Sequence, residues 1–134
     1  MKSETSTDGI PADIRARSFR YAVRAVKLYR FLQDRKDGAG WVIGKQYLRS
    51  ATSIGANLQE ATSAESRPDF IHKYGIAQKE ARESLYWLQL MAEAGVVSRT
   101  RLGPLIRETE ELISILTAIL LKLKRRKPIT ATGN

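Results

Sequence analysis

The sequence predicts an all-α protein, an antiparallel up-down-up-down four-helix bundle. Apolar residues recur at helical spacing along four stretches, and short segments rich in glycine or proline separate those stretches. The chain has 134 residues, enough for one hydrophobic core without disulfides or a structural metal. We therefore expect one bundle domain over residues 12–127, with flexible tails at 1–11 and 128–134.

The first helix is expected from Ala12 to about Lys36 and carries two different rows of side chains. The apolar row, which we expect to face the core, is Phe19, Ala22, Val23, Val26 and Tyr29. The opposite row is basic and comprises Arg17, Arg20, Arg24 and Lys27. Such a row on a rigid element suits contact with phosphates. Plain solvation, or neutralisation by glutamates of another helix, explains it equally well.

Asp37, Gly38 and Gly40 predict a turn, after which Trp41 opens the second helix and covers one end of the core. This helix is expected to run to about Ala64. Its core stripe is Leu48, Ala51, Ile54, Gly55, Leu58 and Ala61. Beside it lies a polar row of Ser50, Ser53, Asn57 and Glu60. Small hydroxyls and an amide favour a polar seam against a neighbouring helix or subunit; an exposed polar flank is the alternative.

The third helix is predicted to begin after Ser66, which can cap it, with Pro68 and Asp69 in its first turn. Its packing seam is Phe70, Tyr74, Ala77, Ala81, Leu85, Leu88 and Ala92. A second row contains Ile76, Glu80, Glu83, Trp87 and Met91. Carboxylates mixed with large apolar groups suit a subunit interface with ion pairs, and Arg49 is a candidate partner. A partly exposed strip touching a loop is the alternative.

Gly95 is expected to end the third helix and Pro104 to begin the fourth. The fourth helix is apolar over a wide arc, which favours a central position or contact with another subunit. It ends in a basic run of Lys122, Lys124, Arg125, Arg126 and Lys127. These cations complement the negative end of the helix, but they exceed what that role requires and also suit phosphates.

Charge and composition limit the classes of function. The chain carries 23 Lys and Arg against 14 Asp and Glu, a net charge of +9, which favours RNA or DNA as a partner. There is no cysteine and one histidine, His72, so we expect no metal or other cofactor. Glu80 and Glu83 lie one turn apart but have no nucleophile or base beside them, so we expect no enzymatic activity. No segment predicts a signal peptide or a membrane span, which favours the cytoplasm.

Two segments resemble a known family. QYLRSATSIGANLQEATSAES and DFIHKYGIAQKEARESLYWLQLMAEAG are similar to the bacterial four-helix-bundle proteins related to the 23S rRNA intervening-sequence proteins. The resemblance extends over about residues 19–124. The positions that carry it best are Gln46, Arg49, Ser50, Ser53, Ile54, Asn57, Glu60, Ala77, Lys79, Glu80, Glu83, Ser84, Trp87 and Leu88.

The resemblance implies an antiparallel bundle that assembles as a homopentameric ring with a central channel. The fold is shared with the accessory variability proteins of diversity-generating retroelements, which are also basic and are thought to bind a reverse transcriptase and nucleic acid. Neither group supplies catalytic residues to transfer to this sequence.

Two hypotheses follow. The first is a non-enzymatic, basic, oligomeric protein that binds structured RNA or other nucleic acid through the phosphates, using the cations of the first helix and of the C-terminal basic run. The second is an interaction scaffold that docks a partner enzyme, such as a reverse transcriptase. In both, the row Arg49, Ser50, Ser53, Asn57, Glu60, Glu80, Glu83 and Trp87 forms a polar seam or an oligomer interface.

Overall fold

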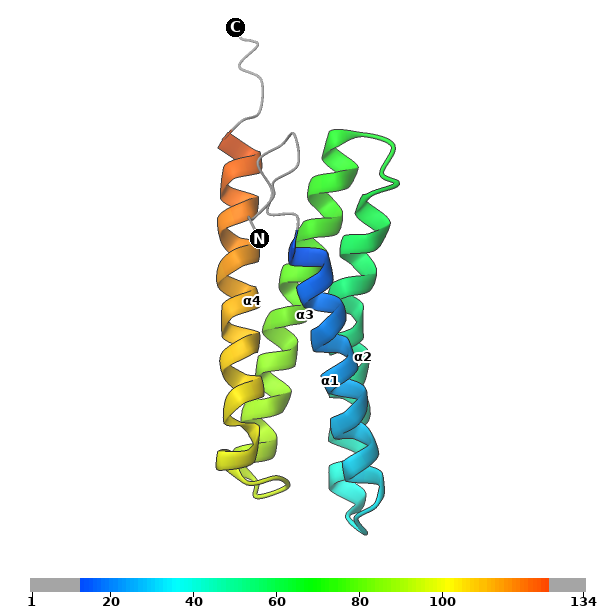
Figure 1. The fold of residues 1–134 in the computed structure, drawn as a ribbon, viewed down its shortest axis with the longest axis vertical. Helices are drawn as coiled ribbons and strands as arrows, with labels where there is room; N and C mark the ends of the chain where they lie inside the picture. The colour runs from blue at the N-terminus through cyan, green and yellow to red at the C-terminus, as the bar shows by residue number, and fades with distance from the viewer. Residues whose placement is uncertain (1–12, 126–134) are drawn as a thin grey trace, which may run out of the picture.

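The computed structural model describes residues 13–125, which fold into four long α-helices. They are α1 (Asp13–Gln33), α2 (Gly38–Ala61), α3 (Arg67–Glu93) and α4 (Arg99–Arg125). Helix α1 packs on α2, α2 on α3 and α3 on α4, and α1 also touches α4 (Figure 1). This part of the chain has no strand, which confirms the all-α prediction. The predicted tails at 1–11 and 128–134 lie outside the described residues.

Helix α2 begins earlier than predicted, and Trp41 has a different role. The carboxylate of Asp37 caps the helix by accepting the N–H of Gly40 at 3.3 Å, so the first helical residue is Gly38. Trp41 does not close the core, since it is 44% exposed. Its indole N–H donates to the carbonyl oxygens of Leu32 and Arg35, at 3.0 and 2.9 Å. The indole therefore satisfies backbone acceptors at the end of α1.

The two ends of α3 match the prediction. The Ser66 hydroxyl accepts the N–H of Asp69 at 3.2 Å and caps the helix start, with Pro68 in the first turn. At the other end Gly95 has a φ of 75°, a left-handed conformation that glycine adopts without steric cost. The N–H of Val96 then reaches back to the carbonyl of Met91 at 2.8 Å and closes the helix end.

Helix α4 begins at Arg99, and the prediction that it begins at Pro104 is wrong. The Ser98 hydroxyl accepts the N–H of Arg101 at 3.2 Å, and the Ser98 carbonyl accepts the N–H of Leu102 at 3.1 Å. Pro104 is tolerated inside the helix. It removes one backbone donor, and the carbonyl left without that partner belongs to the exposed residue Thr100, where water can bind.

The core-facing side of α1 also differs from the prediction. Phe19 is 69% exposed and Val23 is 40% exposed, while Ala22, Val26 and Tyr29 are only partly buried, so the row assigned to the core lies at the surface of the bundle. The buried face instead consists of Ile14, Ser18, Tyr21, Ala25 and Leu32. The apolar row that remains outside becomes a surface that the fold of one chain does not cover.

Close approach of α1 to α2 explains this choice of face. A Cβ atom added to Gly55 would lie 3.3 Å from the Ser18 hydroxyl oxygen, and one added to Gly44 would lie 2.7 Å from a methyl carbon of Leu32. Small residues at the crossing let the two backbones come together. The bulky row containing Phe19 would not fit into that space.

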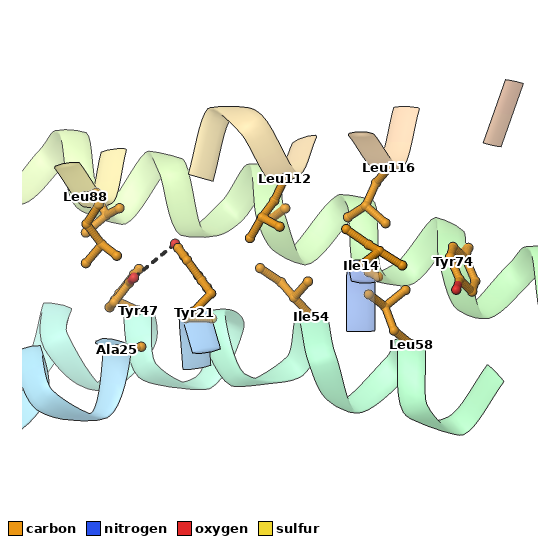
Figure 2. Packing of buried hydrophobic residues seen from close by; sticks show 14 of the residues in the cluster. Ile14, Tyr21, Ala25, Tyr47, Ile54, Leu58, Tyr74, Leu88, Leu112 and Leu116 are labelled. Atoms are coloured by element: carbon orange, nitrogen blue, oxygen red, sulfur yellow. Dashed lines mark hydrogen bonds between the residues drawn. The ribbon is translucent and has the colours of Figure 1, made fainter. Parts of the chain in front are cut away.

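A chain of hydroxyl groups crosses the core and joins three helices. Tyr47 of α2 donates to the hydroxyl of Tyr21 at 3.0 Å (Figure 2). The Tyr21 hydroxyl lies 2.5 Å from that of Thr109 on α4, and Thr109 donates to the Leu105 carbonyl at 2.7 Å. Burial raises the pKa of both tyrosines, so the phenols stay neutral. Among the described residues, every buried side-chain polar atom has a partner.

Candidate nucleic-acid interface

The basic row of α1 is divided between a paired cation and unpaired ones. Arg17 forms two hydrogen bonds to Glu108 of α4, Nε to Oε2 at 2.7 Å and Nη2 to Oε1 at 2.9 Å. Nη2 also lies 3.2 Å from a carboxylate oxygen of Glu111. The Arg17 contact holds the pKa of Glu108 below its usual value. Neutralisation by glutamates, the alternative considered for this row, therefore applies to Arg17.

The other three cations of the row remain available. Arg20, Arg24 and Lys27 are exposed, and none has an ion pair or a side-chain hydrogen bond within residues 13–125. Positive charge from Arg24 and Arg20 contributes to the lowered pKa of Glu108. These residues form a cationic ridge on the side of α1 that adjoins α4.

A further cation, Arg101 of α4, belongs to this surface and was missed from the sequence. Its guanidinium carbon lies 4.1 Å from the ring centroid of Phe31, a cation–π contact. Arg101, Arg24, Lys27 and Phe31 are among the residues lining a groove of about 260 Å³, and none of the lining residues is acidic. The sequence feature that could have predicted this is Ser98, a helix-capping residue type that places Arg101 in the first turn of a helix rather than in a loop.

The basic end of α4 is described in part. Lys122, Lys124 and Arg125 are exposed, while Arg126 and Lys127 lie outside the described residues. Arg67 of α3 donates to the Leu123 carbonyl at 2.8 Å and so binds an acceptor at this end of α4. These exposed cations complement the negative end of the α4 dipole.

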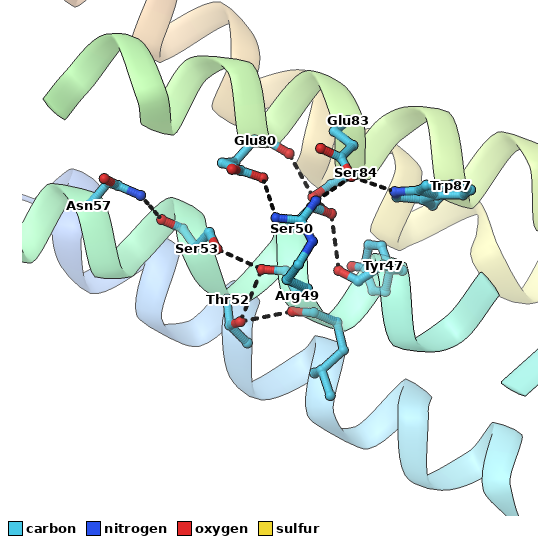
Figure 3. Close-up of polar contacts among 11 residues, drawn as sticks. Tyr47, Arg49, Ser50, Thr52, Ser53, Asn57, Glu80, Glu83, Ser84 and Trp87 are labelled. Atoms are coloured by element: carbon cyan, nitrogen blue, oxygen red, sulfur yellow. Dashed lines mark hydrogen bonds and ion pairs between the residues drawn. The ribbon is translucent and has the colours of Figure 1, made fainter. Parts of the chain in front are cut away.

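The predicted polar seam lies between α2 and α3. The hydroxyls of Ser50 and Ser84 are 2.8 Å apart and fully buried (Figure 3). Arg49 binds the carboxylates of Glu80, at 3.4 Å, and of Glu83. The indole N–H of Trp87 donates to the same Glu83 carboxylate at 2.9 Å. Four of the predicted seam residues, Arg49, Ser50, Glu80 and Glu83, thus join two helices of one chain, whereas the Trp87 hydrogen bond lies within α3.

Of the remaining seam residues, Glu60 contacts α3, whereas Ser53 and Asn57 do not. Glu60 accepts a hydrogen bond from Lys73 of α3 at 2.9 Å. The Ser53 hydroxyl donates to the Arg49 carbonyl at 2.7 Å, and the Asn57 amide donates to the Ser53 carbonyl at 2.8 Å. The side chains of Ser53 and Asn57 therefore bind the backbone of their own helix, a pattern that sequence spacing cannot distinguish from contact across a seam.

The Glu83 carboxylate of the seam is unsuited to acid catalysis. The Arg49 contact and the Trp87 hydrogen bond hold the pKa of Glu83 below its usual value, whereas a general acid requires a raised pKa. Residues 13–125 contain no group of three side chains able to hold a metal ion. Within the same range no helix is long and apolar enough to cross a membrane.

These features define the class: a basic, all-α protein of four helices, with paired carboxylates between α2 and α3 and exposed cations on α1 and α4. The sequence model described as "23S rRNA-intervening sequence protein" matches residues 12–118. The chain belongs to this family, as the resemblance predicted.

A solved structure supports the assignment. It is the crystal structure of a protein with unknown function from the S23 ribosomal protein family of Bacteroides thetaiotaomicron VPI-5482. The two sequences are 41% identical and the TM-score is 0.75, with 80% of this chain and 97% of that chain covered. No curated protein matches the chain.

Proposed function

We propose that this protein is a non-enzymatic, cytoplasmic RNA-binding protein that holds nucleic acid, RNA or DNA, through the phosphates. The observation that carries the proposal is the set of cations along α1 and α4. Arg20, Arg24 and Lys27 form no ion pair within residues 13–125, and Arg101 lies across the groove from α1. The cations at the end of α4 provide a second basic surface. When clustered, accessible cations bind phosphates, counterions condensed on the nucleic acid are released, and this release drives sequence-independent binding.

The family name supports RNA as the ligand, because it refers to intervening sequences of 23S rRNA. The related protein of known structure has no assigned function. The choice of RNA over other polyanions therefore depends on the family name together with the charge distribution.

We further propose an antiparallel up-down-up-down arrangement that assembles as a homopentameric ring. The contacts of α2 with α3 support opposite directions, since Glu60 pairs with Lys73 and Ser50 with Ser84. Large apolar side chains left exposed by one chain support self-association: Phe19, Val23, Trp41, Val42, Tyr86 and Leu121. A ring would repeat each weak phosphate contact and raise the overall affinity.

The test is a comparison of two triple variants that lose the same charge. Replacing Arg20, Arg24 and Lys27 by alanine removes the ridge, whereas replacing Lys45, Lys79 and Arg82 by alanine removes cations elsewhere on the described surface. We expect the ridge variant to bind structured RNA more weakly. A plot of the logarithm of its binding constant against the logarithm of the salt concentration should have a slope that is smaller in magnitude by roughly 0.7 to 0.9 for each phosphate that the variant no longer binds. Equal weakening in both variants would show that only total charge matters.

A scaffold that docks a partner enzyme, such as a reverse transcriptase, is the second candidate. The observation that favours it is a groove of about 580 Å³ whose lining combines the large side chains of Tyr29, Trp41 and Val42 with the polar side chains of Gln33, Lys45 and Gln46. Apolar contacts survive high salt, unlike phosphate contacts. Recovery of one protein partner after nuclease treatment, with no RNA retained at moderate salt, would favour this candidate.

A further inference from the structure

The groove between α1 and α4 has two chemically different parts. Its apolar wall includes Leu28 and Phe31 of α1 and Leu105 of α4. Its cationic part is formed by Arg24 and Lys27 on one side and by Arg101 on the other. A ligand that fills this space must combine a flat or apolar portion with a negative charge.

Arg101 lies against an aromatic ring at the groove. Its guanidinium stacks on Phe31 at 4.1 Å, while the guanidinium carbon of Arg35 lies 5.4 Å from the same ring centroid. Arg35 is itself anchored, because it donates to the Val96 carbonyl at 2.9 Å. Arg101 is exposed, so its planar group is accessible to a ligand. Guanidinium planes are surfaces on which unpaired RNA bases stack.

The size of the groove restricts the ligand further. At about 260 Å³ it lies just below the range of small-molecule pockets, which begins at about 300 Å³. This space suits one nucleobase. Paired bases are stacked inside the duplex and cannot enter, so a duplex could offer only its phosphates to the rim.

We propose that the α1–α4 groove receives one unpaired nucleotide of an RNA strand. The base stacks on Arg101 against the apolar wall, and the adjoining phosphate is bound by Arg24 and Lys27. This inference rests on the proposed RNA binding and assigns its ligand class, unpaired rather than duplex RNA. Arg101 is then the residue that makes the protein prefer unpaired RNA to duplex RNA.

The test compares strands that differ in their bases but not in their charge. The probes are a single-stranded RNA of about six nucleotides, an abasic sugar-phosphate strand of the same length, and a duplex. We expect the wild-type protein to bind the RNA strand at least about fivefold more tightly than the abasic strand, the low end of a stacking contribution. Arg101→Lys retains the charge but loses the plane, so it should abolish that difference and leave duplex binding unchanged.

Two further variants control for folding and for the wall of the groove. Arg82→Lys makes the same chemical change at an exposed site on α3 and should have no effect on any probe. Phe31→Leu keeps an apolar wall but removes the ring that orients Arg101, so it should reproduce the loss. Circular dichroism of each variant verifies the helical fold.

Three other outcomes would overturn part or all of the proposal. Equal wild-type affinity for the RNA and abasic strands would overturn base insertion while leaving phosphate binding intact. Failure to bind any of the probes would overturn the proposed function as well. If uridine 5′-monophosphate bound as tightly as the RNA strand, the ligand would be a free nucleotide, and the assignment to an RNA strand would be wrong.

Discussion

Tyr21 is the residue on which the polar part of the core depends. It is 1% exposed, accepts a hydrogen bond from Tyr47 at 3.0 Å and lies 2.5 Å from the Thr109 hydroxyl. Tyr21→Phe would leave the buried Tyr47 hydroxyl without its acceptor. We expect the free energy of unfolding to fall by about 1 to 3 kcal/mol, measured by urea denaturation at a fixed protomer concentration. Tyr86→Phe is the matched control, because Tyr86 is exposed. A loss equal to that of the control would show that the hydroxyl chain is dispensable.

At the scale of elements, the sequence predicted what local chemistry determines. The start of α3 was predicted correctly because Ser66, Pro68 and Asp69 act within one turn. The buried face of α1 was predicted wrongly, since both faces follow the helical period and only the close crossing with α2 places Ser18 against Gly55. The same limit applies to the candidate site. Periodicity grouped Arg20 with Arg24, but the pairing of Arg17 and the groove beside Arg101 require α4 to lie next to α1.

The ion pair that joins α1 to α4 should make stability depend on pH. Arg17 lowers the pKa of Glu108 from its ordinary 4.5, so the pair stabilises the fold above that pH and stops doing so as the pH falls through the lowered value. Glu108→Gln removes the titration. We expect about 1 kcal/mol lower stability for Glu108→Gln at neutral pH, and a difference from wild type that shrinks below pH 4.5.

The control for this ion pair is Glu110→Gln, because Glu110 is exposed and has no ion pair within the described residues. Thermal unfolding at a series of pH values measures the effect. A constant difference between wild type and Glu108→Gln down to strongly acidic pH would contradict the prediction, because the stabilisation would not then come from the ionised carboxylate.

For the whole molecule, the outward apolar row of α1 decides between assembly and partner docking. Phe19 and Val23 lie outside the core of one chain, beside the cationic ridge. Each interface of a ring joins two different surfaces of the chain, so a neighbouring copy can cover the apolar row and leave the ridge exposed. Replacing Phe19 and Val23 by glutamate places charges in the proposed interface. Loss of a large apolar side chain that an interface buries weakens association by on the order of 2 kcal/mol, and the loss recurs at every interface of a ring. We therefore expect light scattering to give the mass of a monomer for this variant and of an oligomer for the wild type.

The control variant, Gln59→Glu with Gln89→Glu, adds the same charge at exposed sites and should keep the oligomer. If the mass of the Phe19 and Val23 variant stayed that of the wild-type oligomer, the row would be outside the interface and available to a different protein. The monomeric variant also tests where RNA binding comes from. If it bound RNA more weakly but kept the preference for unpaired strands, one chain would suffice for that preference and the ring would serve to raise the affinity.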